Sequence, residues 1–173
     1  MITIISGTNR KFSKTLIVAK SYQEVLTSMG IESQLFSMDQ LPATISQTYL
    51  SDPKDPEFEQ LIEKYIRSTD RFIVLIPEYQ ATFPGIFKLF LDGVRPRDFE
   101  GKKMALVGIS SGRGGNVRGL DHLTSALHYL NVHVYHNKYA ISKIMELVDA
   151  EFKLTDEDTL KGLRRQAEGF MKY

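Results

Sequence analysis

Two short runs in the middle of the chain are apolar at nearly every position. They are residues 71–76, which read RFIVLI, and residues 103–109, which read KMALVGI. An unbroken apolar run of this length is typical of a strand that is covered on both of its faces. Strands of that kind belong to parallel sheets with helices packed on both sides. This feature therefore predicts an α/β fold built on a parallel sheet.

The rest of the chain repeats the same alternation of strand and helix. Three more short apolar runs are predicted to be strands: residues 2–5, 31–36 and 132–135. Residues 37–56 look the least ordered, and residues 136–154 match no element. Strand and helix thus alternate five times, which predicts parallel strands joined by right-handed crossovers.

Five segments between and after these strands carry apolar residues every three or four positions, as one face of a helix does. For the first helix we expect Ser13 as the N-cap and Gly30 at the end. Asp55-Pro56 reads as the N-cap and first residue of the second helix, and Pro84-Gly85 lies near the start of a short third one. A fourth is expected at 120–130. The last, at 160–170, is expected to be capped by Thr155.

Composition narrows the class of protein. The length of 173 residues suits a single domain spanning residues 1–173. The chain has no cysteine, which excludes disulfides, thiolate catalysis and iron–sulfur clusters. A formal charge of +1 argues against nucleic acid or an anionic membrane as a partner. No run approaches a signal sequence or a membrane span, so we expect a cytoplasmic protein.

In such a sheet a ligand binds beyond the carboxyl ends of the strands, where the strand order reverses. The loop after the first strand, residues 6–15, holds four hydroxyl side chains, one arginine and two lysines, and it leads directly into a helix. Hydroxyl groups, cations and the free N–H groups of a helix N-terminus are what a phosphate needs. The loop has neither the Walker A pattern nor the GxGxxG dinucleotide fingerprint, and an ordinary capped turn is the plain alternative.

Two further loops are expected at the same edge of the sheet. Residues 77–85 place an aromatic, an acid and an amide between two prolines, which suits the edge of a flat heterocycle. Residues 110–116 contain three glycines in four positions, which permits close approach of the backbone to a ligand. Neither loop is specific alone, and the indication comes from their shared position.

The sequence resembles the NADPH-dependent FMN reductases, a flavodoxin-like group that includes azoreductase-like, quinone-reductase-like and chromate-reductase-like enzymes. Three motifs carry the resemblance: Gly7-Thr8-x-Arg10-x-x-Ser13; Pro77-Glu78-Tyr79 with Pro84-Gly85-x-x-Lys88-x-x-x-Asp92; and Ser111-Gly112 with Gly114-Gly115. It implies a five-stranded parallel sheet in the order 2-1-3-4-5. Two departures from the family are Gln80-Ala81, where Asn-Gly is usual, and Gly93, where a tryptophan is common.

The resemblance also implies a cofactor and its contacts. Bound FMN would take hydride from NADPH or NADH and pass it to a small acceptor such as a quinone. Its phosphate would lie against Thr8, Arg10, Ser13, Lys14 and Thr15. Its isoalloxazine ring would lie against Pro77, Glu78, Tyr79 and Gln80 on one side and Ser111, Gly112 and Gly115 on the other. No side chain is expected to act as a catalytic acid or base.

The resemblance implies further partners as well. Arg113 and Arg118 are candidates to meet the phosphates of NADPH. Members of the family usually form homodimers or homotetramers, and the phenylalanines at 83, 87 and 90 are compatible with an interface or with the core.

Other functions fit the sequence less well. A flavodoxin-type electron carrier shares the fold, but such carriers are usually strongly acidic, whereas this chain has a charge of +1. A non-catalytic module that binds FMN weakly is the other alternative, and Gln80-Ala81 keeps it open. The histidines at 122, 128, 133 and 136 do not have the spacing of a metal site, so no metal is expected.

Overall fold

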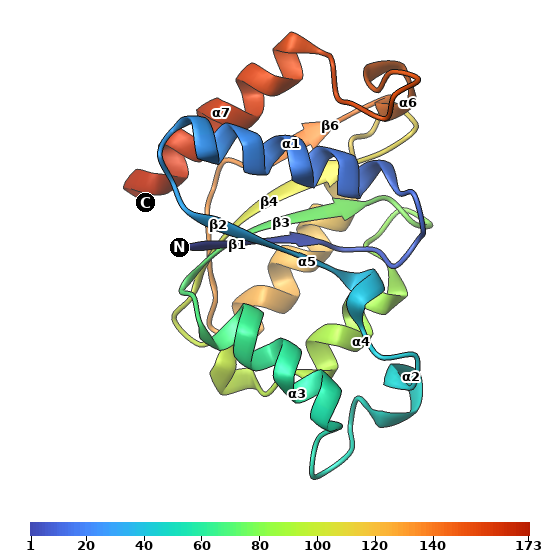
Figure 1. Ribbon diagram of the computed structural model, residues 1–173, viewed down its shortest axis with the longest axis vertical. Coiled ribbons are helices and arrows are strands. Elements are labelled where there is room, and N and C mark those ends of the chain that lie inside the picture. The colour runs from blue at the N-terminus through green and yellow to red at the C-terminus, as the bar shows by residue number, and fades with distance from the viewer.

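The computed structural model describes all of residues 1–173 and confirms the parallel α/β fold (Figure 1). The strands lie in the order β2-β1-β3-β4-β5, and every pair is parallel. This is the predicted order, with its reversal between β1 and β3. Their bounds are β1 Ile2–Ser6, β2 Ser33–Ser37, β3 Arg71–Pro77, β4 Lys103–Ile109 and β5 His133–Val134.

The helices form one layer on each face of the sheet. Figure 1 shows α1 (Lys14–Ser28) and α7 (Glu157–Lys172) together on one face. The other face is covered by α3 (Pro56–Ile62), α4 (Gly85–Gly93) and α5 (Val117–Tyr129). The carboxyl ends of the strands all point to the same side, away from the two chain termini.

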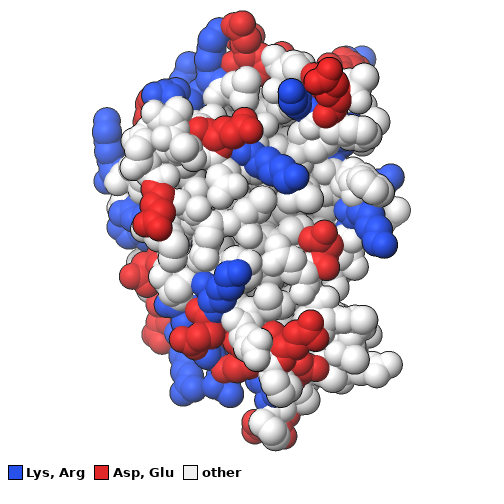
Figure 2. Space-filling model, viewed as in Figure 1, with Lys and Arg blue, Asp and Glu red and all other residues white.

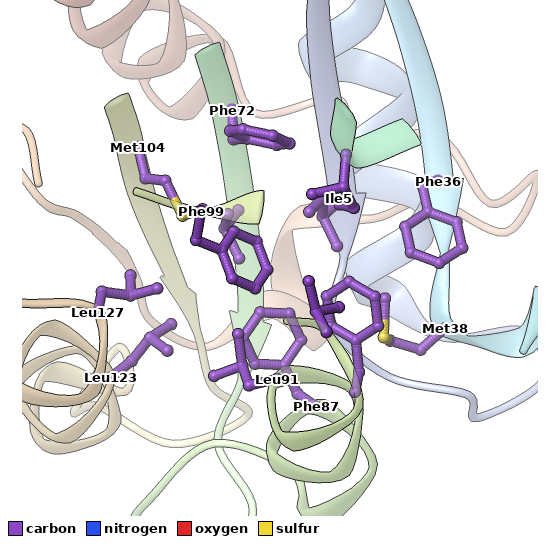
Figure 3. Close-up of a cluster of buried hydrophobic side chains, with 14 of the residues drawn as sticks. Ile5, Phe36, Met38, Phe72, Phe87, Leu91, Phe99, Met104, Leu123 and Leu127 are labelled. Atoms are coloured by element: carbon purple, nitrogen blue, oxygen red, sulfur yellow. The ribbon is translucent and has the colours of Figure 1, made fainter. Parts of the chain in front are cut away.

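Strand β3 shows why the unbroken apolar pattern was informative. Its residues from Phe72 to Ile76 are all fully buried, and they alternate between two hydrophobic clusters. Phe72 points into the cluster under α3, α4 and α5, whereas Ile73 points into the cluster under α1 and α7. Figure 3 shows part of the first cluster. Phe87 and Phe90 of α4 lie inside it, so they are core residues and leave no free surface for a partner.

The fifth strand differs from its prediction because it is interrupted. Residues 133–134 pair with the start of β4, and a further strand, β6 (Tyr139–Ile141), pairs with its end. Between them the buried side chain of Gln166 substitutes for strand pairing, since its Nε2 donates to the carbonyl oxygens of Leu106 at 2.9 Å and Asn137 at 2.8 Å. The hydroxyl of Tyr22 donates to Gln166 Oε1, and burial raises the pKa of that phenol.

Most predicted helix ends are confirmed, and one is wrong. Ser13 Oγ accepts from the N–H of Leu16, and Gly30, with φ of +71°, ends α1. The N–H of Ile31 reaches back to the carbonyl of Leu26, which completes a Schellman motif. The last helix is capped by Asp156 and not by Thr155. Hydrogen bonds from Thr159 to the Asp156 carboxylate satisfy the helix end and lower the pKa of Asp156.

Residues 37–56, which looked the least ordered, contain short elements. A 3₁₀ turn, η1 (Met38–Gln40), is followed by α2 (Ile45–Thr48) and by a cis peptide bond between Asp52 and Pro53. Asp55 then caps α3 as expected. The remaining short elements are η2 (Glu63–Arg67), a π-helical turn that continues α3, the 3₁₀ turn η3 (Pro96–Asp98), and α6 (Ile144–Leu147).

The surface agrees with the nearly balanced charge. Figure 2 shows Lys and Arg side chains interspersed with Asp and Glu on the face drawn there, with no single basic patch. Among the helices, none combines the length and the apolar character that crossing a membrane requires.

Candidate functional site

A pocket of about 180 Å³ lies at the carboxyl ends of β1, β3 and β4. Its walls come from the three loops that the sequence singled out. Of the predicted cofactor contacts, Thr8, Arg10, Ser13, Lys14, Thr15, Pro77, Glu78, Tyr79 and Ser111 line it. The other three, Gln80, Gly112 and Gly115, do not, and all three were expected beside the ring rather than the phosphate. The volume is below the roughly 300 Å³ of a typical ligand pocket.

The first loop turns sharply because Gly7 has no side chain. A Cβ there would lie 2.4 Å from Ile76 Cδ1 and 2.9 Å from the carbonyl oxygen of Leu75. The N–H of Gly7 donates to that same carbonyl, which ties the loop to β3. Beyond Gly7, backbone N–H groups without an acceptor in the chain belong to Thr8, Asn9, Lys11, Phe12, Ser13, Lys14 and Thr15. Free donors at a helix N-terminus suit an anion.

Two cations of this loop line the pocket and are not neutralised. Neither Arg10 nor Lys14 has a carboxylate within 4 Å. The ammonium of Lys14 lies 4.7 Å from the ring centroid of Phe152. Because no carboxylate neutralises these charges, both are available to a bound anion.

Thr8 lies at the base of the pocket and is only 1% exposed. Its Oγ1 lies 2.9 Å from the hydroxyl oxygen of Tyr79, in the loop after β3, and accepts a hydrogen bond from the N–H of Arg10 at 3.2 Å. The loop after β1 and the loop after β3 are therefore joined by a side-chain hydrogen bond.

The loop after β3 forms a tight hairpin turn. Tyr79 and Thr82 exchange two backbone hydrogen bonds, and the residues between them, Gln80 and Ala81, have φ of +53° and +62°. Two positive φ values define the turn for which Asn-Gly is the preferred sequence. The departure from the family at these positions therefore leaves the turn type intact. Thr82 Oγ1 also lies 3.0 Å from Nδ1 of His122 on α5.

The glycine-rich loop after β4 is held through its carbonyl groups. Ser110 Oγ donates to the carbonyl of Gly112 and accepts from the N–H of Gly115. The carbonyl of Gly112 also accepts from the N–H of Lys143, and that of Arg113 accepts from Ser142 Oγ. The N–H groups of Ser111, Gly112, Arg113 and Gly114 have no acceptor in the chain. Several carbonyl groups of the loop are therefore occupied, while four of its N–H groups remain available as donors.

Gly115 packs against the fold, unlike the exposed glycines that precede it in the loop. It is buried, has φ of +56°, and a Cβ on it would lie 2.7 Å from the Cβ of Ala140 in β6. Gly112, by contrast, is exposed with no atom near its Cβ position. Gly115 therefore seats the loop on β6.

The sequence reading missed Ile144 and Met145, which line the pocket from α6. They belong to the segment 136–154, for which no element was predicted. The segment reaches the pocket because β6 lies beside the end of β4, and the N–H of Ile144 donates to the carbonyl of Ser110. The one available signal was the spacing of apolar residues in 141–147, and it is too short to specify a position in the fold.

Comparisons with known proteins agree with this site. Residues 1–146 match the family described as NADPH-dependent FMN reductase. The chain is 30% identical over 153 residues to an NAD(P)H-dependent FMN reductase of Pseudomonas aeruginosa, covering 86% of this chain and 81% of that protein. It is 32% identical over 124 residues to a 2-hydroxy-1,4-benzoquinone reductase of a Burkholderia species, covering 69% and 67%.

A solved structure supports the fold independently. The flavoenzyme NAD(P)H:(acceptor) oxidoreductase FerB from Paracoccus denitrificans superposes with a TM-score of 0.82 at 23% identity, covering 99% of this chain and 95% of that one.

Proposed function

Because the chain belongs to the NADPH-dependent FMN reductase family, we propose that it is an FMN-dependent NAD(P)H oxidoreductase that reduces a quinone-like or other small acceptor. The observation that carries the proposal is the pocket beside the capped N-terminus of α1, with its free N–H groups and unpaired cations. Bound FMN supplies the redox chemistry, since it accepts hydride from a nicotinamide and passes the electrons on. The protein supplies binding, orientation and electrostatics.

In this proposal the first loop holds the phosphate. Arg10 and Lys14 supply positive charge, and Thr8, Ser13 and Thr15 lie around the same pocket. The N–H groups of Lys14 and Thr15 are free at the start of α1, where the helix dipole favours a negative group. The residues present therefore fit a phosphate.

The ring would be held between the hairpin and the glycine-rich loop. Pro77, Glu78, Tyr79 and Gln80 would contact it on one side and Ser111 and Gly112 on the other, while the buried Gly115 seats that loop on β6. The free N–H groups from Ser111 to Gly114 would be available to stabilise negative charge on the ring. No side chain is assigned a proton-transfer role.

Arg113 and Arg118 are the candidates to meet the phosphates of NADPH. Both are exposed, Arg113 in the glycine-rich loop and Arg118 in the first turn of α5, and neither forms an ion pair. Replacing both by alanine is expected to raise the KM for NADPH, with the KM for the acceptor unchanged. An unchanged KM for NADPH would remove them from the proposal.

The test is a visible absorption spectrum of protein purified without added flavin. A yellow protein that bleaches with NADPH under anaerobic conditions and recovers with a quinone supports the proposed activity. A yellow protein that neither NADPH nor NADH reduces would instead indicate an electron carrier. A colourless protein that does not quench the fluorescence of added FMN would overturn the proposal and leave the fold unaffected.

A homodimer is part of the proposal. A groove of about 650 Å³ between α4 and α5 has Phe83, Leu91, Tyr129 and Leu130 in its lining, and Tyr129 is 87% exposed. Two copies related by a two-fold axis would each place Tyr129 against the groove of the other. Light scattering on a sizing column is expected to give twice the chain mass, and Tyr129→Arg is expected to give the monomer. A wild-type monomer would contradict this arrangement.

We also propose a cytoplasmic location. The chain contains no cysteine, which fits a reducing compartment. Cell fractionation tests this, and recovery outside the cytoplasmic fraction would contradict it.

A further inference from the structure

The hydroxyl of Thr8 has a limited number of hydrogen bonds available, and the structure shows how most of them are used. A hydroxyl group has one hydrogen to donate and two lone pairs that accept. The N–H of Arg10 occupies one lone pair of Thr8 Oγ1. The contact with the Tyr79 hydroxyl, at 2.9 Å, uses either the second lone pair or the hydrogen. Which of the two it uses decides whether Thr8 can donate to a ligand.

An anion in the pocket selects one of these arrangements. Phosphate oxygens accept hydrogen bonds, so Thr8 contributes to binding only if its hydrogen is free. That requires Tyr79 to be the donor. The phenol is the more acidic of the two hydroxyl groups and is therefore the better donor. Burial of Thr8 strengthens the chain of hydrogen bonds, because each one polarises the next where water is excluded.

We propose that Tyr79 is a positioning residue for the phosphate of FMN, acting through Thr8. This inference rests on the proposed function, and it gives Tyr79 a role beyond contact with the flavin ring. Tyr79 donates to Thr8 Oγ1, and this directs the Thr8 hydrogen toward the phosphate. Tyr79, which we place beside the ring, thereby also orients a donor beside the phosphate, so the ring and phosphate ends of the site are coupled.

A purely structural role for Tyr79 makes a different prediction. If its hydroxyl only anchored the hairpin, its loss would affect any flavin that uses the hairpin. If it acts through Thr8 on the phosphate, its loss affects FMN and not riboflavin, which has the same ring and ribityl chain without the phosphate. The ratio of the two affinities therefore separates the roles.

The experiment measures dissociation constants of FMN and riboflavin for flavin-free protein by fluorescence quenching. Tyr79→Phe removes only the hydroxyl and is expected to raise the Kd for FMN about tenfold, with the Kd for riboflavin unchanged within about twofold. Tyr49→Phe is the matched control, since the Tyr49 hydroxyl makes no hydrogen bond, and it is expected to change neither Kd. Thermal unfolding of each variant without flavin verifies that it is folded.

A double-mutant cycle on FMN alone gives a second measure. Thr8→Val removes the hydroxyl and keeps the branched shape, and in that background Tyr79→Phe is expected to raise the Kd for FMN no more than about twofold. Equal weakening of FMN and riboflavin, an unchanged Kd for FMN, or full additivity in the cycle would overturn the role of Tyr79. A wild-type protein that binds neither flavin would overturn the proposed function itself, which is a separate outcome.

Discussion

The loop after β1 and the glycine-rich loop after β4 flank the same pocket but are held in different ways. The first is tied to β3 and Tyr79 only near its start, through Gly7 and Thr8, and from Asn9 to Thr15 its order comes from its own residues, since Ser13 caps α1 and Thr8 Oγ1 accepts from the N–H of Arg10. The second is held by its own Ser110 and also from outside, because Ser142 and Lys143 occupy its carbonyl groups and β6 lies against its base.

Substitutions in the two loops should therefore have different effects, mainly on ligand affinity in the first loop and mainly on stability in the second. The first loop leaves its cations and many N–H groups without partners, so substitutions there should change ligand affinity more than folding. The glycine-rich loop is packed into the fold, so substitutions at its buried positions should lower the free energy of unfolding.

The largest expected effect is at Gly115. Gly115→Ala is expected to lower the free energy of unfolding by about 3 kcal/mol, because a left-handed backbone with a side chain costs roughly 1–2 kcal/mol and overpacking against Ala140 costs roughly 1–3 kcal/mol. Urea denaturation without flavin measures it. The control is Gly112→Ala in the same loop, where no atom lies within 4 Å and the change should stay within about 0.5 kcal/mol. Equal losses would show that β6 does not hold the loop.

The next effect is on binding, in the first loop. Replacing Arg10 and Lys14 together by alanine is expected to raise the Kd for FMN about 100-fold, or roughly 2.7 kcal/mol, because two charge-assisted contacts are lost. Stability without flavin should change by less than about 1 kcal/mol, since neither residue is in an ion pair.

The matched control removes the same charge nearby. Lys11 and Lys20 have no ion pair and do not line the pocket, so their double alanine variant should weaken FMN only a few-fold through long-range attraction. If both double variants weakened FMN equally, the phosphate would not lie where we place it.

A smaller loss of stability is expected at Ser110. This side chain is 4% exposed and makes two hydrogen bonds within the glycine-rich loop, at 2.9 and 2.8 Å. Ser110→Ala should lower the free energy of unfolding by about 2 kcal/mol, since it leaves the buried N–H of Gly115 without an acceptor. Its neighbour Ser111 is exposed and makes no such bond, so Ser111→Ala should change stability by less than about 0.5 kcal/mol. A neutral Ser110→Ala would indicate that the segment at 142–144 is sufficient to hold the loop.

The smallest effect is a gain at the hairpin. Replacing Gln80 by Asn and Ala81 by Gly provides the residues that two positive φ values favour, so the free energy of unfolding should rise by about 1 kcal/mol and Tm by roughly 2–4 °C. Ala43→Gly is the control, because Ala43 is exposed with a negative φ and the same change there should destabilise slightly. A lower Tm for the hairpin variant would contradict the turn geometry.

The parts of the fold that depend on neighbouring residues could be predicted from the sequence, whereas those that depend on distant contacts could not. The bounds of β4 and the start of β3 were predicted because apolar runs covered on both faces are visible locally, and so was the cap at Ser13. Thr155 was chosen over Asp156 because adjacent residues of cap type cannot be ranked without the backbone. The split of the fifth strand depends on Gln166, about 30 residues later, and no local pattern reveals such a contact.

Within the site, too, the loop built from neighbouring residues was predicted, whereas the contribution of a distant segment was not. The residues of the first loop were predicted and lie together at the pocket. Ile144 and Met145 were missed because the strand that delivers them, β6, is three residues long and pairs with a single neighbour. Gln80-Ala81 departs from the Asn-Gly that is usual in the family, but two hydrogen bonds between Tyr79 and Thr82 close a turn of the type that Asn-Gly favours.

The interrupted edge of the sheet also affects how this protein meets other chains. A long, flat outer strand is a template on which a foreign strand can pair and start aggregation. Here the outer strand is broken between β5 and β6, and an amide side chain occupies the middle of β4. No continuous ladder is therefore available on that border. The same break that lets α6 reach the pocket protects the concentrated protein from edge-to-edge association.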